Sequence, residues 1–190
     1  MDIHYTDSLT NLLNEVTLRV KENFGHLTPE QLNWKPAPNR WSIAQCLDHL
    51  SVSNKTYFPE FERMAKQIPF DNFWGKIPFL PGLFGKILLK SVHPDSKPRL
   101  KAPSKFVPSK SNLPETVLTD FEHTQQELIN HYQALKSVSN HESLKMTSPA
   151  SGFVTYSLKD CLILLVLHEQ RHLNQAIRVM QSPEFPVNPV

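Results

Sequence analysis

The sequence predicts an all-α protein, a four-helix bundle, and three observations point to this fold class. Four segments of the 190-residue chain carry apolar residues at helical spacing, and no segment shows a convincing strand pattern. Two of these segments open with the residue pattern of a helix start. A long connection, residues 66–111, separates the second segment from the third, which lets those two helices run parallel. The length suits a single domain spanning residues 1–190.

The first helix is predicted from about Thr6 to His26. Apolar side chains recur along it at the spacing of one helical face: Leu9, Leu12, Leu13, Val16, Val20 and Phe24. The stretch that follows, LTPEQLNWKPAPNR, contains three prolines and is predicted to be an irregular connection.

The second helix is predicted to begin at Ser42, which caps it together with Gln45 three residues later in a capping box. Trp41 before the cap and Cys46 after it have the spacing of a hydrophobic staple. One stripe follows, made of Ile43, Leu47, Leu50, Asn54, Tyr57, Phe61 and Met64. Pro59 predicts a kink within this helix.

The third helix is predicted to begin near Asn112, with Pro114 in its first turn. Its apolar face comprises Val117, Phe121, Leu128, Tyr132 and Leu135. The fourth repeats the opening pattern of the second, with Ser157 as the cap, and runs to about Met180 before Pro183 stops it.

The connection over residues 66–111 differs from the rest of the chain, because it is aromatic and proline-broken at first and basic afterwards. Residues 73–114 contain one acid, Asp95, against eight basic residues: Lys76, Lys86, Lys90, Lys97, Arg99, Lys101, Lys105 and Lys110. The favoured interpretation is an irregular loop whose aromatic side chains pack on the bundle while its lysines lie in water. The alternative is a lid over a site, where the basic residues attract an anionic ligand. A membrane-surface helix over Leu83–Lys90 is short, so no membrane partner is expected.

Composition excludes several classes of function. The net charge of +2 gives no reason to expect a nucleic-acid partner. Glycine is scarce, at 5 residues, and neither a dinucleotide-binding fingerprint nor a P-loop string is present. The N-terminus has no basic start followed by an apolar run, and the longest apolar run, Cys161–Leu167, is too short to span a bilayer. A cytoplasmic protein with two reduced cysteines is therefore expected.

The fourth helix contains the string His168-Glu169-x-x-His172, which suits a metal site. Histidines four residues apart stack on one face of a helix, and two imidazoles so placed can bind one divalent ion. A catalytic zinc site needs about three protein ligands. The third ligand of one zinc-protease class is a histidine after an intervening glycine, but Gln175 and Arg178 occupy the matching positions.

A second protease class takes its third ligand from a glutamate on a later helix. Glu184 is the sole glutamate after His172, and it follows Pro183, so no helix carries it and a protease is not expected. His49, on the flank of the second helix, is the best remaining third ligand, because bundle cores build metal sites from facing helices. From the spacing alone, two buried polar histidines at a helix interface explain the pair equally well.

Three features together resemble the DinB-like superfamily of metalloenzymes. A tryptophan-proline connection leads into W-S-x-x-x-x-L-x-H-L at Trp41–Leu50, a last helix carries H-x-x-x-H-x-x-Q from His168 to Gln175, and the loop KPRLKAPSKFVPS lies between them. The resemblance implies a bundle with up-down-down-up topology, a homodimer, and one metal ion bound by His49, His168 and His172.

Members of that family include transferases that join low-molecular-weight thiols to electrophiles, so a metal-dependent thiol S-transferase is the expected function. Zinc and nickel are the metals expected, a small molecule such as a thiol is the expected partner, and Gln175 is expected to orient water or substrate. Two alternatives remain at this point: a metal-dependent hydrolase with Glu169 as its base, and a non-catalytic metal-binding stress protein. Because Glu169 lies about 100° round the helix from His168, the favoured interpretation places it in solvent or in an ion pair.

Overall fold

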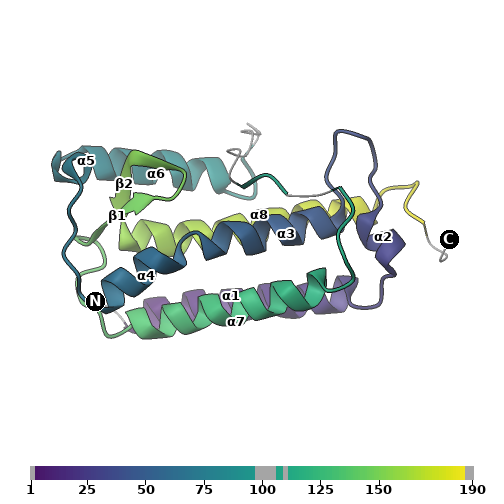
Figure 1. Ribbon diagram of the computed structural model, residues 1–190, viewed down its shortest axis with the longest axis horizontal. Coiled ribbons are helices and arrows are strands. Elements are labelled where there is room, and N and C mark those ends of the chain that lie inside the picture. The colour runs from purple at the N-terminus through teal and green to yellow at the C-terminus, as the bar shows by residue number, and fades with distance from the viewer. Residues whose placement is uncertain (1–2, 97–105, 109–110, 187–190) are drawn as a thin grey trace.

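The structure is a computed structural model, and it describes residues 3–96, 106–108 and 111–186 (Figure 1). The chain is mostly helical, as an all-α class requires. Its elements are α1 (Ile3–Phe24), α2 (Pro29–Asn33), α3 (Ile43–Lys55), α4 (Phe58–Ala65), α5 (Phe73–Lys76), α6 (Leu80–Val92), α7 (Val117–Leu135), β1 (Lys145–Ser148), β2 (Ser151–Ser157) and α8 (Leu158–Met180). No helix among the described residues is long and apolar enough to cross a membrane.

The long helices pack side by side along the molecule (Figure 1). Helices α1 and α3 each contact both α7 and α8, while α4 continues the line of α3 against α7. Their apolar residues form two core clusters. One contains Leu13, Leu128 and Leu165, and the other contains Val16, Leu50, Phe121 and Leu173. Helices α1, α7 and α8 therefore contribute to both clusters, whereas α3 contributes to the second and α4 to the first.

The predicted capping chemistry is present. Ser42 and Gln45 form the capping box at the start of α3, and the Ser157 hydroxyl accepts a hydrogen bond from the Asp160 backbone N–H at the start of α8. A further capping box, between Thr28 and Gln31, starts the short helix α2 within the connection that was predicted to be irregular. These local bonds fix where the helices begin, and therefore the axial position of the residues that follow.

The second predicted helix is in fact two helices. Helix α3 ends at Lys55 and α4 begins at Phe58, so the expected kink is a break. Pro59 lies in the first turn of α4, a position where the absence of its backbone N–H costs no intrahelical hydrogen bond.

The third helix begins at Val117, later than the predicted start near Asn112. The amide side chain of Asn33 explains the difference, because it donates to the Leu113 carbonyl at 2.9 Å and accepts from the Leu113 N–H at 2.8 Å. These two bonds hold the backbone around Pro114 outside the helix, a long-range contact that local sequence does not reveal.

The absence of strands was a wrong prediction. Strands β1 and β2 form an antiparallel hairpin, in which Met146 pairs with Tyr156 and an irregularity falls between Thr147 and Ser148. The strands are short and break register, so they do not show the alternation that identifies a strand in sequence. The Asn72 amide donates to Thr147 Oγ1 at 2.8 Å and so joins the segment before α5 to the hairpin.

The connection after α4 was predicted to be irregular, and its first half is helical instead. Helices α5 and α6 lie on the side of the molecule away from α1 and α7 (Figure 1). Gly85 permits the close approach of α6 to α8, because a Cβ atom there would lie 2.4 Å from Asp160 Oδ2. The aromatic side chains Phe73 and Phe79 do not pack on the core but are 70% and 71% exposed. The basic residues Lys97, Arg99, Lys101, Lys105 and Lys110 lie outside the described residues.

Candidate metal centre

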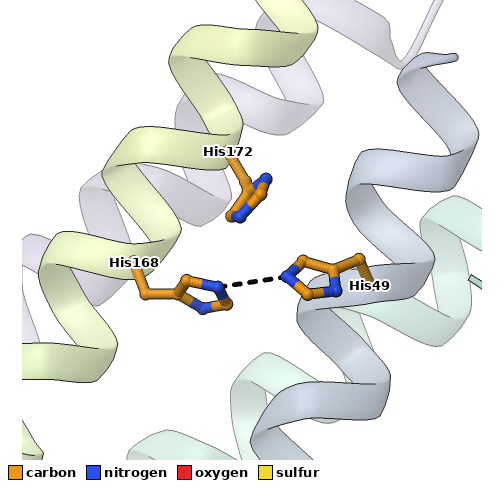
Figure 2. Close-up of side chains that lie close together, drawn as sticks. All are labelled: His49, His168 and His172. Atoms are coloured by element: carbon orange, nitrogen blue, oxygen red, sulfur yellow. Dashed lines mark hydrogen bonds between the residues drawn. The ribbon is translucent and has the colours of Figure 1, made fainter. Parts of the chain in front are cut away.

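The three histidines singled out in the sequence come together between α3 and α8 (Figure 2). His49 lies on α3, and His168 and His172 lie one turn apart on α8, with all three rings directed into the space between the helices. Their potential ligand atoms all lie within 4.8 Å of one another. His49 Nε2 and His168 Nε2 are 3.1 Å apart. These residues could therefore bind a single metal ion.

The hydrogen bond on the far side of His49 fixes which of its nitrogens faces the cluster. His49 Nδ1 contacts the backbone carbonyl oxygen of Phe106, and a carbonyl only accepts, so Nδ1 carries the proton. In the neutral ring, Nε2 then holds a lone pair, and Nε2 is the atom directed at His168. A ligand histidine whose other N–H is held by a backbone carbonyl is the usual arrangement around metals in proteins.

Burial keeps the three imidazoles neutral, which is the form that binds a metal. Burial lowers the pKa of His168 to about 3, with the neighbouring His49 and Arg171 acting in the same direction. Burial likewise lowers the pKa of His172 well below its ordinary value, and a hydrogen bond with Gln175 opposes the shift. The pKa of His49 is also lowered by burial, against the Phe106 carbonyl and Asp48.

The donor set fits a divalent ion such as zinc, because three neutral imidazoles are a known catalytic ligand set that leaves one position for water or substrate. His49 is only 3% exposed, whereas His168 and His172 are partly exposed. The cluster is therefore accessible from the side of α8. Cys46 and Cys161 are fully buried in the two core clusters and are not members of the histidine group.

Trp41 forms one wall of the cluster, a contact that was not expected from the sequence. Its ring stacks on His172, with centroids 5.6 Å apart and an interplanar angle of 23°, and it lies 4.8 Å from the His49 ring. Trp41 had been interpreted as a staple residue for the α3 helix start. A tryptophan next to a capping serine carries no signal of a second role, so the sequence alone could not have found this contact.

Glu169 does not lie where the favoured interpretation placed it. It is completely buried rather than exposed, and no ion pair involves it among the described residues. One carboxylate oxygen accepts from Asn54 Nδ2 at 2.7 Å and the other from Gln125 Nε2 at 2.7 Å. Gln125 Nε2 also lies 3.4 Å from Thr17 Oγ1. Burial raises the pKa of Glu169 to about 7, and the two amide donors oppose the shift.

These four polar side chains come one from each of α1, α3, α7 and α8, and they form a layer between the two apolar core clusters. On α8, for example, Glu169 falls between Leu165 of one cluster and Leu173 of the other. We call Thr17, Asn54, Gln125 and Glu169 the polar layer. Asn54 was a signal of this layer, because it interrupts the apolar stripe of the second helix. With both oxygens of Glu169 bound by amides, the geometry gives no support to Glu169 as a catalytic base.

A cavity of about 450 Å³ lies between α6 and α8. Its lining residues are Leu89, Lys90, His93, Asp95, Ser96, Ile163 and Leu167. Arg171 Nη1 donates to the backbone carbonyls of His93 at 2.9 Å and Ser96 at 3.3 Å, which ties the end of α6 to α8. Leu167 of the cavity directly precedes His168, so helix α8 carries both the cavity lining and two of the histidines.

Comparison with known proteins agrees with the histidine pattern. The sequence model of the DinB superfamily matches residues 13–176, which include the three histidines. The uncharacterized protein YuaE of Bacillus subtilis (strain 168) is 23% identical over 175 residues, covering 92% of this chain and 98% of YuaE. No solved structure matches the chain. Since the match covers most of its length, the chain belongs to the DinB superfamily.

Proposed function

We propose that this protein is a metal-dependent enzyme that transfers a low-molecular-weight thiol to an electrophile. The observation that carries the proposal is the convergence of three neutral imidazoles, one buried and two partly buried, with the His49 lone pair directed into the cluster. Partial exposure of His168 and His172 leaves room for a small molecule beside the ligands. A divalent ion bound there would lower the pKa of a thiol that it coordinates and so supply thiolate at neutral pH.

The overall reaction is a nucleophilic substitution at a carbon atom of the electrophile, with the thiol sulfur as the nucleophile. A carbon–sulfur bond forms between the thiol and the electrophile, the leaving group departs with its bonding electrons, and the thiol proton passes to water. His49, His168 and His172 would hold the ion, and Trp41 would shield the His172 side of the cluster from water. Gln175 would hold the ring of His172 in place, which refines its predicted role in orienting water or substrate.

The apolar cavity between α6 and α8 supports a site for the organic part of a substrate. Leu89, Ile163 and Leu167 supply apolar lining, and Lys90 supplies a cation suited to a carboxylate. This arrangement does not depend on the basic lid that was the alternative interpretation of the sequence, and five of the eight basic residues of that segment lie outside the described residues. We therefore propose an electrophile with an apolar body, paired with a carboxylate-bearing thiol.

We also propose that the long helices form an up-down-down-up bundle within a single domain. The long connection between α4 and α7 supports this order, because it can return the chain to the end of the molecule at which α3 began. Packing of α3 against α7 is consistent with it. A cytoplasmic homodimer remains the expected state, on the strength of the family resemblance alone.

The first experiment is elemental analysis of the full chain, purified without a histidine tag, beside His49→Ala. We expect about one zinc or nickel ion per chain in the wild type and almost none in His49→Ala. His123→Ala is the matched control, because His123 is exposed on α7 and should keep the metal. Metal retained in His49→Ala would overturn the assigned ligand set.

The second experiment measures thiol consumption with a bimane electrophile, in metal-loaded and chelator-treated protein. Turnover that requires both metal and His49 would support the transferase. A protein that binds metal through the three histidines but consumes none of the thiols supplied would contradict the transferase and favour the non-catalytic alternative.

A further inference from the structure

Exposed apolar side chains gather on one part of the surface. Nine large hydrophobic residues are exposed among the described residues, and six of them lie on α5, on α6 with its N-cap, and on the β-hairpin. We call these six the apolar face: Phe73, Trp74, Phe79, Leu83, Ile87 and Phe153. A concentration of exposed apolar side chains on a protein surface usually marks a site where a partner protein, a membrane or a ligand binds.

On α6 the exposed residues follow the spacing of a single helical stripe. Phe79, Leu83 and Ile87 are four residues apart and are 71%, 48% and 52% exposed. The opposite side of the helix packs on α8 and β2, where Gly85 is buried against Asp160. The helix is thus apolar on the side that faces solvent as well as on the side that faces the protein.

Aromatic rings on α5 and the hairpin extend this stripe beyond one helix. Trp74 contacts Phe73 with ring centroids 5.7 Å apart, and Phe153 with centroids 6.5 Å apart. All three are more than two-fifths exposed, at 70%, 44% and 56% for Phe73, Trp74 and Phe153. Tryptophan and phenylalanine on one surface are typical of proteins that enter the headgroup region of a bilayer.

The charges around the apolar face are mostly positive. Residues 68–93 contain Lys76, Lys86 and Lys90, and their sole acid, Asp71, already pairs with Lys76 at 3.0 Å. The hairpin, residues 145–157, adds Lys145 and no acid. Lys86 and Lys90 are exposed beside Leu83 and Ile87 on the same helix. A surface complementary to this face therefore carries negative charges on its outside and has an apolar interior below them.

We propose that the apolar face docks on an anionic membrane surface, with α5, α6 and the tip of the hairpin lying among the lipid headgroups and no helix crossing the bilayer. From the sequence we expected no membrane partner, because the Leu83–Lys90 helix is short. The folded chain adds Phe73, Trp74 and Phe153 to that helix, which enlarges the surface. The proposal is independent of the metal centre.

The same charges argue against a second copy of the chain as the occupant. A two-fold interface places the same patch on both partners, so a mostly positive face would meet another one, and Asp71 is already paired with Lys76. Anionic lipid removes that repulsion and adds attraction for each lysine near the surface.

The test is binding of the full chain to sedimented vesicles at low salt. Vesicles of equal parts phosphatidylcholine and phosphatidylglycerol are compared with vesicles of phosphatidylcholine alone. We expect binding to the anionic vesicles and much weaker binding to the neutral ones. Lys86→Glu should lower the partition coefficient about thirtyfold, and the double variant Leu83→Ser with Ile87→Ser more than about tenfold.

Matched controls come from α1, on the other side of the molecule. Leu18 is 55% exposed and Lys21 is exposed, so Leu18→Ser and Lys21→Glu remove the same chemistry from a different surface. Both should bind vesicles within about twofold of the wild type. The tryptophan emission should shift to the blue on binding, and Trp74→Phe should remove that shift.

Several results would overturn the proposal. Absence of binding to anionic vesicles would do so, as would equal losses in the α1 controls. A wild-type dimer that becomes monomeric in the Leu83→Ser and Ile87→Ser double variant, without vesicle binding, would assign the face to a second copy. Metal content should be unchanged in Lys86→Glu, so failure here is distinguishable from failure of the proposed function.

Discussion

His168 and Glu169 are neighbours on α8, but their side chains enter different surroundings. His168 points between α3 and α8, where two more imidazoles converge and a hydrogen bond joins two ring nitrogens. Glu169 points into the centre of the helices, where Asn54 and Gln125 each donate an amide hydrogen bond to it. Glu169 is fully buried with an amide donor on each carboxylate oxygen, whereas His168 is partly exposed and lies beside two other imidazoles.

The difference lies in how each group is satisfied. In the polar layer each carboxylate oxygen of Glu169 has an amide donor of its own, while Asn54 Oδ1 has no hydrogen-bond partner among the described residues. In the histidine cluster, burial leaves the rings neutral, and His168 and His172 are partly exposed. A neutral, partly exposed cluster of imidazole nitrogens suits the binding of a ligand from outside the protein. We infer that the layer stabilises the fold and the cluster binds.

The largest effect should separate these two roles. Glu169→Ala leaves two buried amide donors unpaired and should lower the free energy of unfolding by about 3 kcal/mol while leaving the metal content unchanged. His168→Ala should instead lose the metal, while its free energy of unfolding in the presence of chelator should change by only about 1 kcal/mol. Urea unfolding and elemental analysis measure the two quantities, and Glu122→Ala, an exposed glutamate on α7, is the control. If Glu169→Ala also released the metal, the two sites would not be separate.

In metal-free protein, a rise in pH should change the stability contributions of the two sites in opposite directions. The pKa of Glu169 is raised to about 7 in the folded state, so its stabilising contribution is present below the unfolded value of about 4.5 and is lost as pH rises through about 7. The histidines have lowered pKa values, so their contribution is present above about 6.5 and is lost as pH falls.

Glu169→Gln removes the first contribution and leaves the second. Relative to the wild type, the variant should therefore gain about 2 kcal/mol of unfolding free energy between about pH 5 and about pH 7. Urea unfolding in chelator at the two pH values gives this difference. Equal pH dependence in both proteins would show that Glu169 does not titrate in this range.

The sequence predicts the parts of these sites that depend on local spacing, and it does not predict the parts that depend on contacts between distant segments. The pair His168 and His172 was visible because a four-residue spacing places both on one helical face. His49 was selected as the best remaining third ligand because bundle cores build metal sites from facing helices, and the family resemblance then gave the same residue. The Phe106 carbonyl that orients His49 and the Trp41 wall were not predictable, because both are contacts between distant segments.

The fold shows the same division. Helices α1 and α8 were predicted within a few residues, because their stripes and caps are local features. The start of α7 depends on Asn33, which lies 80 residues away from Leu113, and the hairpin has too little alternation to be recognised. Exposure of Phe73, Trp74 and Phe79 reversed the expectation that the aromatic residues of this connection pack on the bundle, since composition does not reveal which side of a helix faces the core.

A smaller effect should separate the thiols from the metal ligands. Cys46 lies three residues before His49, but burial raises the pKa of its thiol to about 12 and its side chain belongs to the core. Cys46→Ser places an unpaired hydroxyl in that core and should lower the unfolding free energy by about 2 kcal/mol, while the metal content stays at the wild-type level. Loss of metal in Cys46→Ser would make the thiol a fourth ligand. Native protein should also resist alkylation by iodoacetamide, since the thiolate is the reactive form.

The smallest effect tests where the polar layer ends. Thr17 Oγ1 lies 3.4 Å from Gln125 Nε2, a longer distance than the 2.7 Å between Gln125 and Glu169, and the same hydroxyl donates to the Leu13 carbonyl at 3.0 Å. Thr17→Val keeps the shape of the side chain and removes these bonds, so we expect a loss of only about 0.5 kcal/mol. In a double-mutant cycle with Gln125→Ala, the coupling should be small, because the main partner of Gln125 is Glu169. A coupling as large as that between Gln125 and Glu169 would instead mean that α1 holds the carboxylate in place through Gln125, and that the layer is a four-helix network rather than a three-helix one.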